Sequence, residues 1–482
     1  MRTRQMLDGL WEFLPVGTAP DAPPPADIPR AGFAAERIRV PGYWRTFPPD
    51  VGGDWGAYDH YRYPPEWQAA PAAWYRLVFR PAVPVPDPPG RVRMGFDAVA
   101  GHSTVFLNGQ ALGENADSFL PFAFDVTNLL RPDADNELCV HVAPPRTRAG
   151  LWLQPCGSWV GWHMRGIWQP VWLETVPVPA IADVFVQPSV RRQRLVVDVT
   201  LDGAGGAADA TVRVAIRDGE RVVLHLGEQR AAVAVAHHST AGEAGTVLRF
   251  ERAWPDARCW SPEDPHLYHA RVELAVDGRV VDTHWVRFGF REFWIDATRF
   301  VLNGRPLRLF GDSWHYMGVA QQTPAYARTW FTFARQFGVN AIRTHAMPYP
   351  PCYFDVADEM GMLLIDETAI YGSAGTLAFD APEFWEACRD HVRRLVRRDR
   401  NHPSVIFWSA VNETVWKGGE RIFPGLVSLM ETARALDPTR FVSFDENDCH
   451  VGGAAVTHAG HYGTPQHWER SWRRDRPLTD PD

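Results

Sequence analysis

The sequence predicts a multidomain protein of the β plus α/β class, with a jelly-roll sandwich, an immunoglobulin-like sandwich and an incomplete (β/α)8 barrel. Three observations predict this. The chain has 482 residues, which exceeds one ordinary domain. Up to about residue 290, short runs alternate between apolar and polar residues and are separated by turn-forming residues. After about residue 300, short apolar runs alternate with helical patterns, which is typical of parallel βα units.

The first two segments are predicted to be antiparallel sandwiches. In residues 1–176, many short alternating runs are separated by Pro, Gly and Asp, and one run leads into the hairpin turn Asn108-Gly109. This pattern favours a jelly roll. The Pro-rich junction at 176–179 opens the second segment, residues 177–290. Its length and its alternating runs suit an immunoglobulin-like sandwich.

Residues 291–482 are predicted to be the N-terminal part of a (β/α)8 barrel. The predicted strands are short apolar runs at 307–310, 340–343, 362–365 and 405–408. The predicted helices lie between and after them, at 324–337, 351–360, 382–399 and 421–436. Because no Gly-rich nucleotide fingerprint adjoins these strands, a barrel is preferred to a nucleotide-binding sheet.

Composition narrows the class of partner. The net charge of −8 provides no basic footprint, so neither nucleic acid nor an anionic membrane is expected as a partner. No apolar stretch is long enough to span a membrane, and the N-terminus lacks the apolar core of a signal peptide. We therefore expect a cytoplasmic protein, with secretion still open if the N-terminus has been trimmed. A homo-oligomer is compatible with the sequence.

The cysteines and tryptophans carry weaker signals. The six cysteines are scattered without a CxxC pair, which favours reduced thiols over a zinc site or a disulfide framework. The 21 tryptophans suit a sugar-binding surface, because the C–H face of a pyranose packs on a flat indole. A β-sandwich core is an equally good explanation for any one of them.

Polar side chains follow each predicted barrel strand, where the active sites of such barrels lie. They are Asp312, Trp314, His315 and Tyr316; then Arg343, Thr344 and His345; then Asp366 and Glu367; then Asn412 and Glu413; and, after a later run, His458, His461 and Tyr462. Carboxylates, imidazoles and indoles would therefore meet at one rim. A purely structural barrel has no need for this repetition.

The sharpest motif is the segment 401–413, in which an apolar strand ends in Asn412-Glu413. Glycoside hydrolysis needs a carboxylic acid that protonates the leaving oxygen and a second carboxylate across the anomeric carbon. The neighbouring Asn can bond the sugar 2-hydroxyl, an interaction that strengthens in the transition state. The alternative is that Glu413 is a solvated loop residue or a helix cap.

Segment 401–413 resembles the acid/base signature of glycoside hydrolase family 2, the group of β-galactosidases, β-glucuronidases and β-mannosidases. Similar motifs follow one another along nearly the whole chain, at 7–13, 105–109, 121–127, 165–168, 260–262, 265–268, 288–291, 300–304, 340–345 and 358–367. The resemblance implies a sugar-binding-like jelly roll in the first segment. It also implies a retaining exo-β-glycosidase that uses a double displacement, takes a carbohydrate substrate and needs no cofactor.

The resemblance also implies roles for single residues. Glu413 would be the general acid/base, Asn412 the ligand of the 2-hydroxyl, and Arg343 the cation that holds the carboxylates. Further substrate-binding candidates are His345, Glu367, Asp312, His315, His461 and Tyr462, with Trp314, Trp416 and Trp468 as stacking platforms. A structural role is the alternative for each, and for His345 it is a core-capping imidazole.

Two departures from the family pattern change the expectation. The loop at 311–318 is not the Asn-Arg-His-Glu type of β-galactosidases, which speaks against a metal site there and against galactose specificity. The family nucleophile follows strand seven, and about 34 residues for each βα unit would place it near residue 515. We therefore expect the nucleophile beyond Asp482 and little activity from this chain alone. Glu446 is the alternative nucleophile, although its acidic cluster is more typical of a substrate-positioning loop.

Two other interpretations remain open at this stage. One is a catalytically inactive carbohydrate-binding protein with a degenerate or incomplete barrel. The other is a structural scaffold within a larger assembly. The residues do not identify the sugar or its linkage.

Overall fold

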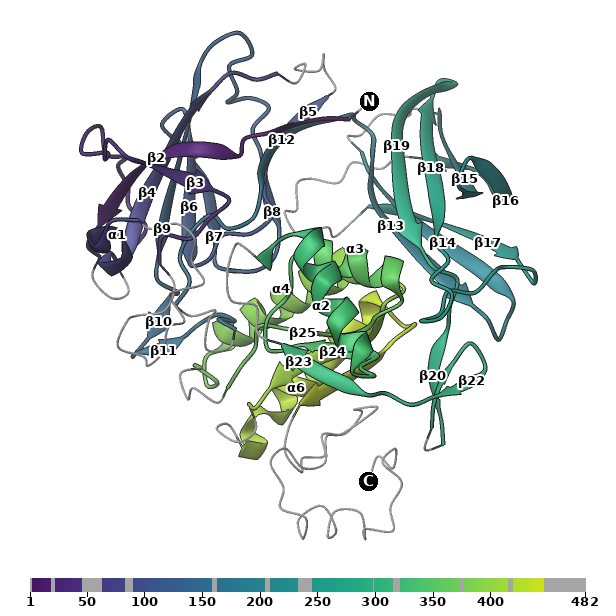
Figure 1. The fold of residues 1–482 in the computed structure, drawn as a ribbon. Coiled ribbons are helices and arrows are strands. Elements are labelled where there is room, and N and C mark those ends of the chain that lie inside the picture. Colours follow the sequence, from purple (N-terminus) through teal and green to yellow (C-terminus); the bar gives the residue numbers. More distant parts are fainter. Residues whose placement is uncertain are drawn as a thin grey trace, which may run out of the picture.

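Two β-sandwiches lie on either side of a parallel α/β unit (Figure 1). This computed structural model describes residues 2–18, 22–45, 63–82, 90–157, 163–203, 209–232, 245–297, 299–314, 321–372, 377–414 and 419–445. The predicted fold class, with a jelly roll, an immunoglobulin-like sandwich and part of a barrel, is confirmed. No described helix has the length and apolar character that a membrane span needs.

The first sandwich is built from two antiparallel sheets. One has the order β3 (Arg37–Val40), β2 (Gly9–Val16), β4 (Ala72–Phe79), β9 (Asn136–Ala143), β6 (His102–Leu107) and β7 (Gln110–Asn115). The other has the order β1 (Thr3–Met6), β12 (Val171–Val176), β5 (Arg91–Phe96) and β8 (Phe122–Asp125). Short elements α1 (Pro65–Ala69), β10 (Thr147–Arg148) and β11 (Leu151–Trp152) flank them. The predicted turn is present, because Asn108 and Gly109 have φ of 52° and 82°, as a two-residue hairpin turn requires.

The second sandwich packs a three-stranded sheet on a four-stranded one. The first sheet has the order β13 (Ala180–Ser189), β14 (Arg194–Asp202) and β17 (Thr246–Ala253). The second has the order β16 (Arg221–Ala232), β15 (Asp209–Asp218), β18 (Tyr268–Val276) and β19 (Arg279–Phe288). Alternate residues such as Val197, Val199, Val212 and Val214 face the core between the sheets, which explains the period-two pattern of the sequence.

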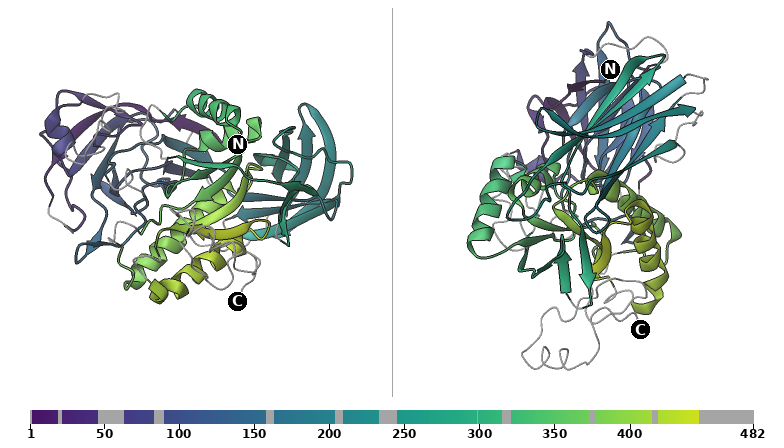
Figure 2. Two further views of the ribbon diagram at one scale, coloured as in Figure 1. Left: turned by 60° about the horizontal axis from the view of Figure 1, so that its bottom comes forward. Right: turned by 90° about the vertical axis from the view of Figure 1, so that its right-hand side faces the viewer.

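The α/β unit has five parallel strands in chain order: β23 (Gly311–Trp314), β24 (Ala341–Thr344), β25 (Leu363–Glu367), β26 (Val405–Asn412) and β27 (Phe441–Asp445). Its helices are α2 (Pro324–Gln336), α3 (Pro351–Met360), α4 (Pro382–Asp399), η3 (Gly419–Ile422) and α6 (Phe423–Leu436). Two further views show these helices beside the sheet (Figure 2). The strand order never reverses, unlike that of a doubly wound sheet, and this is the arrangement of a (β/α)8 barrel.

Local sequence signals explain the helix boundaries. Helix α4 begins with Pro382 at its first turn and buries Phe384, Cys388, Val392 and Leu395, a spacing that places one apolar stripe on the sheet. Helix α3 ends at Gly361, whose φ of 74° is the left-handed conformation that favours glycine.

The predicted first barrel strand at 307–310 is wrong. The first parallel strand is β23, so Asp312 and Trp314 belong to the strand itself and not to the loop after it. Residues 305–307 instead form β22 of a small antiparallel sheet with β20 (Phe293–Asp296) and β21 (Arg299–Leu302). Leu307 and Leu309 pack against an apolar cluster that includes Phe293 and Phe407. The apolar run therefore serves this cluster, which lies at the N-terminal side of the parallel sheet.

The first sandwich and the α/β unit share one continuous core. Phe119 and Trp168 of the sandwich belong to the same buried cluster as Tyr353, Phe354 and Phe384 of the α/β unit. Burial of large aromatic side chains across a boundary fixes the two units relative to each other. Loops of the sandwich are thereby held next to the loops that follow the parallel strands.

Candidate active site

Strand β26 delivers Asn412 and Glu413 to the C-terminal edge of the parallel sheet. All residues of this strand are buried. The Asn412 side chain is completely buried, yet neither Nδ2 nor Oδ1 has a hydrogen-bond partner among the described residues. A buried amide without partners is unfavourable by about 1–3 kcal/mol for each group, so it requires an explanation. A bound hydroxyl group at this position would satisfy it.

The backbone of Glu413 has an unusual conformation. Its φ is 52°, in the left-handed region that non-glycine residues seldom adopt. Such conformations cluster at functional sites, where the surrounding structure enforces them. Here the carboxylate-bearing residue is turned out of the strand, and its side chain is partly exposed. The backbone of Glu413 therefore sets the direction in which its side chain leaves the strand.

The segment 369–372, which follows β25, supports this turn. Asn412 N–H donates to Ile370 O at 2.9 Å, and Gly372 N–H donates to Asn412 O at 3.0 Å. A Cβ atom on Gly372 would lie 2.5 Å from Thr414 Cα and 2.9 Å from Glu413 O. Only glycine can approach the Glu413 backbone this closely without a shift of one of the two segments.

Arg343 on β24 and Glu367 at the end of β25 form an ion pair beside this turn. Arg343 Nε lies 3.6 Å from Glu367 Oε2. Glu367 is fully buried, and its carboxylate accepts from Ala346 N–H at 2.5 Å and from Ser409 Oγ at 2.6 Å. These three partners hold the Glu367 carboxylate at a fixed place.

His345 follows β24 at the same edge. Its ring is partly buried, and its centroid lies 6.4 Å from that of Tyr371. The next residue, Ala346, also has a left-handed backbone, with φ of 49°. This turn aims the Ala346 N–H at Glu367, so the loops after β24 and β25 form one hydrogen-bonded unit.

Asp366 does not belong to this group, although it adjoins Glu367 in the sequence. Successive side chains of a strand point to opposite sides, and Asp366 accordingly approaches Asp399 at the end of α4. Burial, together with the nearby Asp399, raises the pKa of Asp366 well above its usual range. The expectation that Asp366 lies at the catalytic rim is therefore wrong.

The first sandwich holds the other side of segment 369–372. Gly157 N–H donates to Ala369 O at 2.8 Å. Ala369 N–H donates to His391 Nε2 at 2.9 Å, which requires the proton of this imidazole to lie on Nδ1. His391 Nδ1 therefore donates to Asp117 Oδ2, at 2.6 Å. Both peptide groups of Ala369 are thus fixed by the first sandwich, one directly and one through the buried His391.

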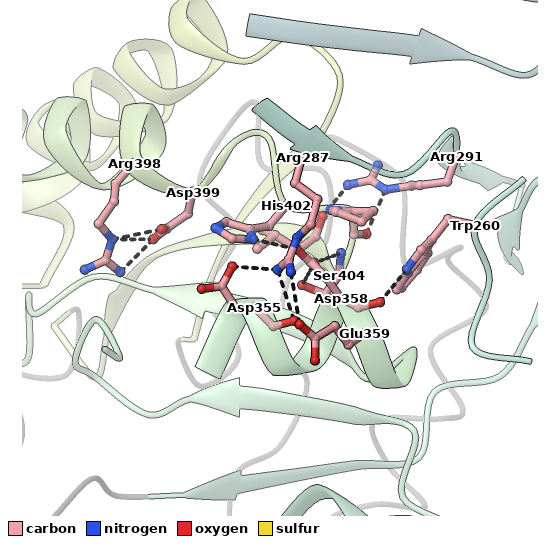
Figure 3. Close-up of polar contacts among 12 residues, drawn as sticks. Trp260, Arg287, Arg291, Asp355, Asp358, Glu359, Arg398, Asp399, His402 and Ser404 are labelled. Carbon is pink, nitrogen blue, oxygen red and sulfur yellow. Dashed lines mark hydrogen bonds and ion pairs between the residues drawn. The ribbon is translucent and has the colours of Figure 1, made fainter. Parts of the chain in front are cut away.

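One group of residues has metal-ligand character, within the ranges that the structure describes. Ligand atoms of Asp355, Asp358 and His402 lie within 4.8 Å of one another. The guanidinium of Arg287 already occupies this cluster, at 2.5 Å from Asp355 and 3.4 Å from Asp358 (Figure 3). His402 Nδ1 lies 2.6 Å from Asp358 Oδ2. The charge that a metal ion would supply is therefore provided by arginine.

The remaining predicted residues lie outside the cluster or outside the described ranges. Asp312 is exposed on β23, and Trp314 ends that strand. The other predicted residues fall outside the described residues: His315, Tyr316, Trp416, Glu446, His458, His461, Tyr462 and Trp468.

Sequence reasoning missed several residues that support the site. Gly372, Ser409 and Tyr371 carry no motif of their own. Asp117 and His391 are 274 positions apart, and no periodicity or spacing could pair them. For Gly372 the signal was its place shortly after a strand that ends in Asp-Glu, which favours a tight turn.

The comparisons with known proteins agree with this architecture. Three family models match in succession: the sugar binding domain of glycosyl hydrolases family 2 at residues 4–177, glycosyl hydrolases family 2 at 180–291, and the TIM barrel domain of glycosyl hydrolases family 2 at 293–470. The chain belongs to glycoside hydrolase family 2. The resemblance found in the sequence motifs is thereby confirmed.

Curated relatives carry glycosidase names. A β-galactosidase of Enterobacter cloacae is 31% identical over 496 residues, which cover 98% of this chain and 45% of that protein. A putative β-glucuronidase of Formosa agariphila is 29% identical over 420 residues, which cover 84% of this chain and 36% of that protein. The chain thus spans less than half the length of these relatives.

Solved structures share the fold. That of Bifidobacterium dentium β-glucuronidase complexed with coumarin-3-O-glucuronide has a TM-score of 0.72 and 26% identity, and the match covers 93% of this chain and 74% of that one. A β-galacturonidase from Eisenbergiella tayi bound to galacturonate has a TM-score of 0.75 at 22% identity, and the match covers 98% of this chain and 78% of that one. The second likeness concerns the fold alone.

Proposed function

We propose that this chain carries the general acid/base of a retaining exo-β-glycosidase that hydrolyses terminal β-linked sugars. One observation carries the proposal most directly: the completely buried side-chain amide of Asn412 has no hydrogen-bond partner in the described part of the chain, and it adjoins Glu413, whose backbone is left-handed. Membership of glycoside hydrolase family 2 supports it. The relatives named β-galactosidase and β-glucuronidase support the substrate class, a β-glycoside.

In this mechanism Glu413 protonates the glycosidic oxygen as the bond to the anomeric carbon breaks. It then takes a proton from the water that hydrolyses the glycosyl-enzyme intermediate. Asn412 bonds the sugar 2-hydroxyl, and this bond strengthens as positive charge develops at the neighbouring carbon. Arg343 stabilises the negative charge of the carboxylates, and His345 contributes to the sugar subsite.

Glu367 is proposed as a positioning and sugar-binding residue and not as the nucleophile. Each of its oxygens already accepts a hydrogen bond, from Ala346 N–H or from Ser409 Oγ, and one is also paired with Arg343. A carboxylate stabilised in this way is a weak nucleophile. The nucleophile of a retaining enzyme is expected on a different element, about 5–5.5 Å from Glu413.

The test is the variant Glu413→Gln in the natural full-length protein. It keeps the shape of the side chain and removes the dissociable proton, so substrates with poor leaving groups should lose about 10²–10⁴-fold in kcat/KM. Dinitrophenyl glycosides need little protonation and should still form the intermediate. Azide, which needs no general base, should restore the second step.

A matched control is Glu431→Gln, on an exposed position of α6, which should leave both substrate types unaffected. Equal losses on both substrate types in Glu413→Gln, without azide rescue, would contradict the role of Glu413. A screen of 4-nitrophenyl β-galactoside, glucuronide, mannoside and glucosaminide would identify the sugar. Glycoside binding without turnover by the full-length protein would favour the alternative, an inactive carbohydrate-binding protein.

A further inference from the structure

A cavity of 490 Å³ lies between the immunoglobulin-like sandwich and the N-terminal side of the parallel sheet. Its walls come from β13, β14 and β17 of the sandwich, from the segment 288–293, and from the loops that contain residues 400–403 and 438–440. The β26 residues Val405 and Asn412 are separated by seven steps, or about 23 Å of extended chain. The cavity is therefore far from the candidate active site.

The charge of this cavity is unusual for a protein whose net charge is −8. Seven arginines and two glutamates line it. Five of the arginines have carboxylate partners: Arg191 with Glu292, Arg194 with Glu251, Arg249 with Asp198, Arg400 with Asp183, and Arg440 with Asp437. The other two, Arg192 and Arg291, form no ion pair with any residue in the described ranges. The cavity thus has a surplus of positive charge.

Arg291 is the more informative of the two, because it is only 4% exposed. It donates from Nε to Pro403 O at 2.9 Å and from Nη2 to Val405 O, both of which are uncharged carbonyl groups (Figure 3). Burial and the neighbouring positive charge of Arg440 lower the pKa of Arg291 well below its usual range, and the more distant carboxylates of Asp437, Asp358 and Glu292 offset this only in part. A buried cation that has no carboxylate in direct contact is only partly compensated for the loss of its hydration. An anion in the cavity would remove this penalty.

We propose that this cavity binds a small tetrahedral oxyanion of the phosphate or sulfate type, held by the guanidinium groups of Arg291 and Arg192. Guanidinium presents paired N–H donors whose spacing matches two oxygens of such an ion. A dianion balances the two arginines that lack carboxylate partners. Because one wall is the immunoglobulin-like sandwich and the other belongs to the α/β unit, the bound ion braces the junction between them.

The first experiment measures binding of inorganic phosphate and of sulfate to the full chain by isothermal titration calorimetry. Ionic strength is kept constant with sodium chloride, because a non-specific charge effect would depend on ionic strength alone. We expect saturable binding of one ion for each chain. We also expect the midpoint of thermal unfolding to rise with the oxyanion concentration and not with chloride, because a ligand that binds the folded state stabilises it.

The second experiment uses two variants and a control. Arg192 is exposed at the cavity, so Arg192→Glu should fold and should weaken oxyanion binding at least tenfold. Arg291→Gln removes the buried charge and should abolish binding while making unfolding independent of phosphate. Arg221→Gln, at an exposed position of β16 outside the cavity, should bind as the natural chain does.

Absence of saturable binding by the natural chain would overturn the proposal. Equal affinity in Arg192→Glu and Arg221→Gln would also overturn it, even if Arg291→Gln failed to fold. None of these measurements uses a glycoside, so their outcome is independent of the proposed enzymatic activity.

Discussion

Three residues define the chemistry at the smallest scale. The buried side-chain amide of Asn412 has no hydrogen-bond partner among the described residues, Glu413 is turned into a left-handed conformation, and Gly372 allows the close approach that keeps this turn in place. These three features are linked. Gly372 N–H donates to the carbonyl of Asn412, and because Gly372 has no Cβ atom, the backbone of Thr414 can lie close to it. A change that moves one of them moves the proposed acid/base.

Gly372→Ala should therefore impair catalysis. The added methyl group would meet backbone atoms at 2.5 Å and 2.9 Å, which cannot yield as a flexible side chain would. A displacement of the acid/base by about 1 Å typically lowers kcat about 10²-fold. The control is Gly17→Ala, because a Cβ there has no neighbour within 4 Å and its φ is not left-handed. Steady-state kinetics of both variants in the natural full-length protein, on an aryl glycoside, would check this, and an unchanged kcat in Gly372→Ala would contradict it.

At the scale of elements, the loop after β25 is held between two units of the protein. On one side it pairs with the end of β26, and on the other it is fixed by Gly157 and by the Asp117–His391 pair. His391 is completely buried on α4, and Asp117 is 4% exposed in the first sandwich. The first sandwich therefore helps to position the candidate site, although Asp117 and Gly157 reach it only through the loop.

Asp117→Asn should loosen this loop. Asp117 Oδ1 accepts from Phe119 N–H and Leu120 N–H, so the oxygen of an amide at position 117 stays there and its NH2 group faces His391 Nδ1. If this NH2 group donates to Nδ1, the ring proton lies on Nε2 and faces the Ala369 N–H. In the other tautomer the amide faces the Nδ1 proton, so one hydrogen bond is lost in either case. The free energy of unfolding should fall by about 1–3 kcal/mol. Amide hydrogen exchange measured by mass spectrometry should rise in the peptide that contains 369–372.

The control for this variant is Asp133→Asn, in an exposed turn of the same sandwich, which should change neither quantity. If exchange at 369–372 in Asp117→Asn matched that of the control, the Asp117–His391 pair would have no role in fixing the loop.

At the scale of the whole molecule, a buried carboxylate contributes to the junction between the immunoglobulin-like sandwich and the α/β unit. Asp358 on α3 is fully buried, and it accepts from Ser404 N–H and Oγ at 3.1 Å and 2.6 Å. Both of these bonds go to Oδ1, whereas Arg287 of the sandwich and His402 contact the other oxygen, Oδ2 (Figure 3). Nearby, Trp260 Nε1 donates to Asp358 O at 2.8 Å. The junction therefore depends on the charges of three neighbouring groups.

The stability of this junction should depend on pH through His402. Burial opposes the charged imidazole, but Asp358, followed by Asp399 and Asp355, outweighs it and raises the pKa of His402. A raised folded-state pKa contributes stability that is fully present below the unfolded value of about 6.5. This stability is lost as the pH rises through the folded-state pKa.

Urea unfolding between pH 6 and pH 9 would check this expectation. The natural chain should lose stability over the alkaline part of the range, relative to His402→Gln, which can still donate to Asp358 but does not titrate. Parallel pH profiles of the two proteins would contradict the assignment to His402.

The sequence by itself determined the fold class and much of the catalytic edge. Runs that alternate between apolar and polar residues, separated by turn residues, predicted the sandwiches, because successive side chains of a strand face the core and the solvent in turn. The apolar run 405–408, within segment 401–413 and among alternating helical patterns, predicted a buried parallel strand that leads to Asn412-Glu413, because strands covered on both faces are apolar throughout. The family motifs depend on short segments, and they predicted membership correctly.

Only the tertiary structure decided which distant residues meet. The apolar run 307–310 looked like a barrel strand. Its first residue instead belongs to a small antiparallel sheet, and Leu307 and Leu309 pack against an aromatic cluster. Asp366 looked like a rim residue, yet its place on the opposite side of β25 directs it to Asp399. The pairing of Asp117 with His391 and the arginine-lined cavity arise between units far apart in the chain. Local pattern fixes what a segment can form, whereas packing between units decides what each side chain contacts.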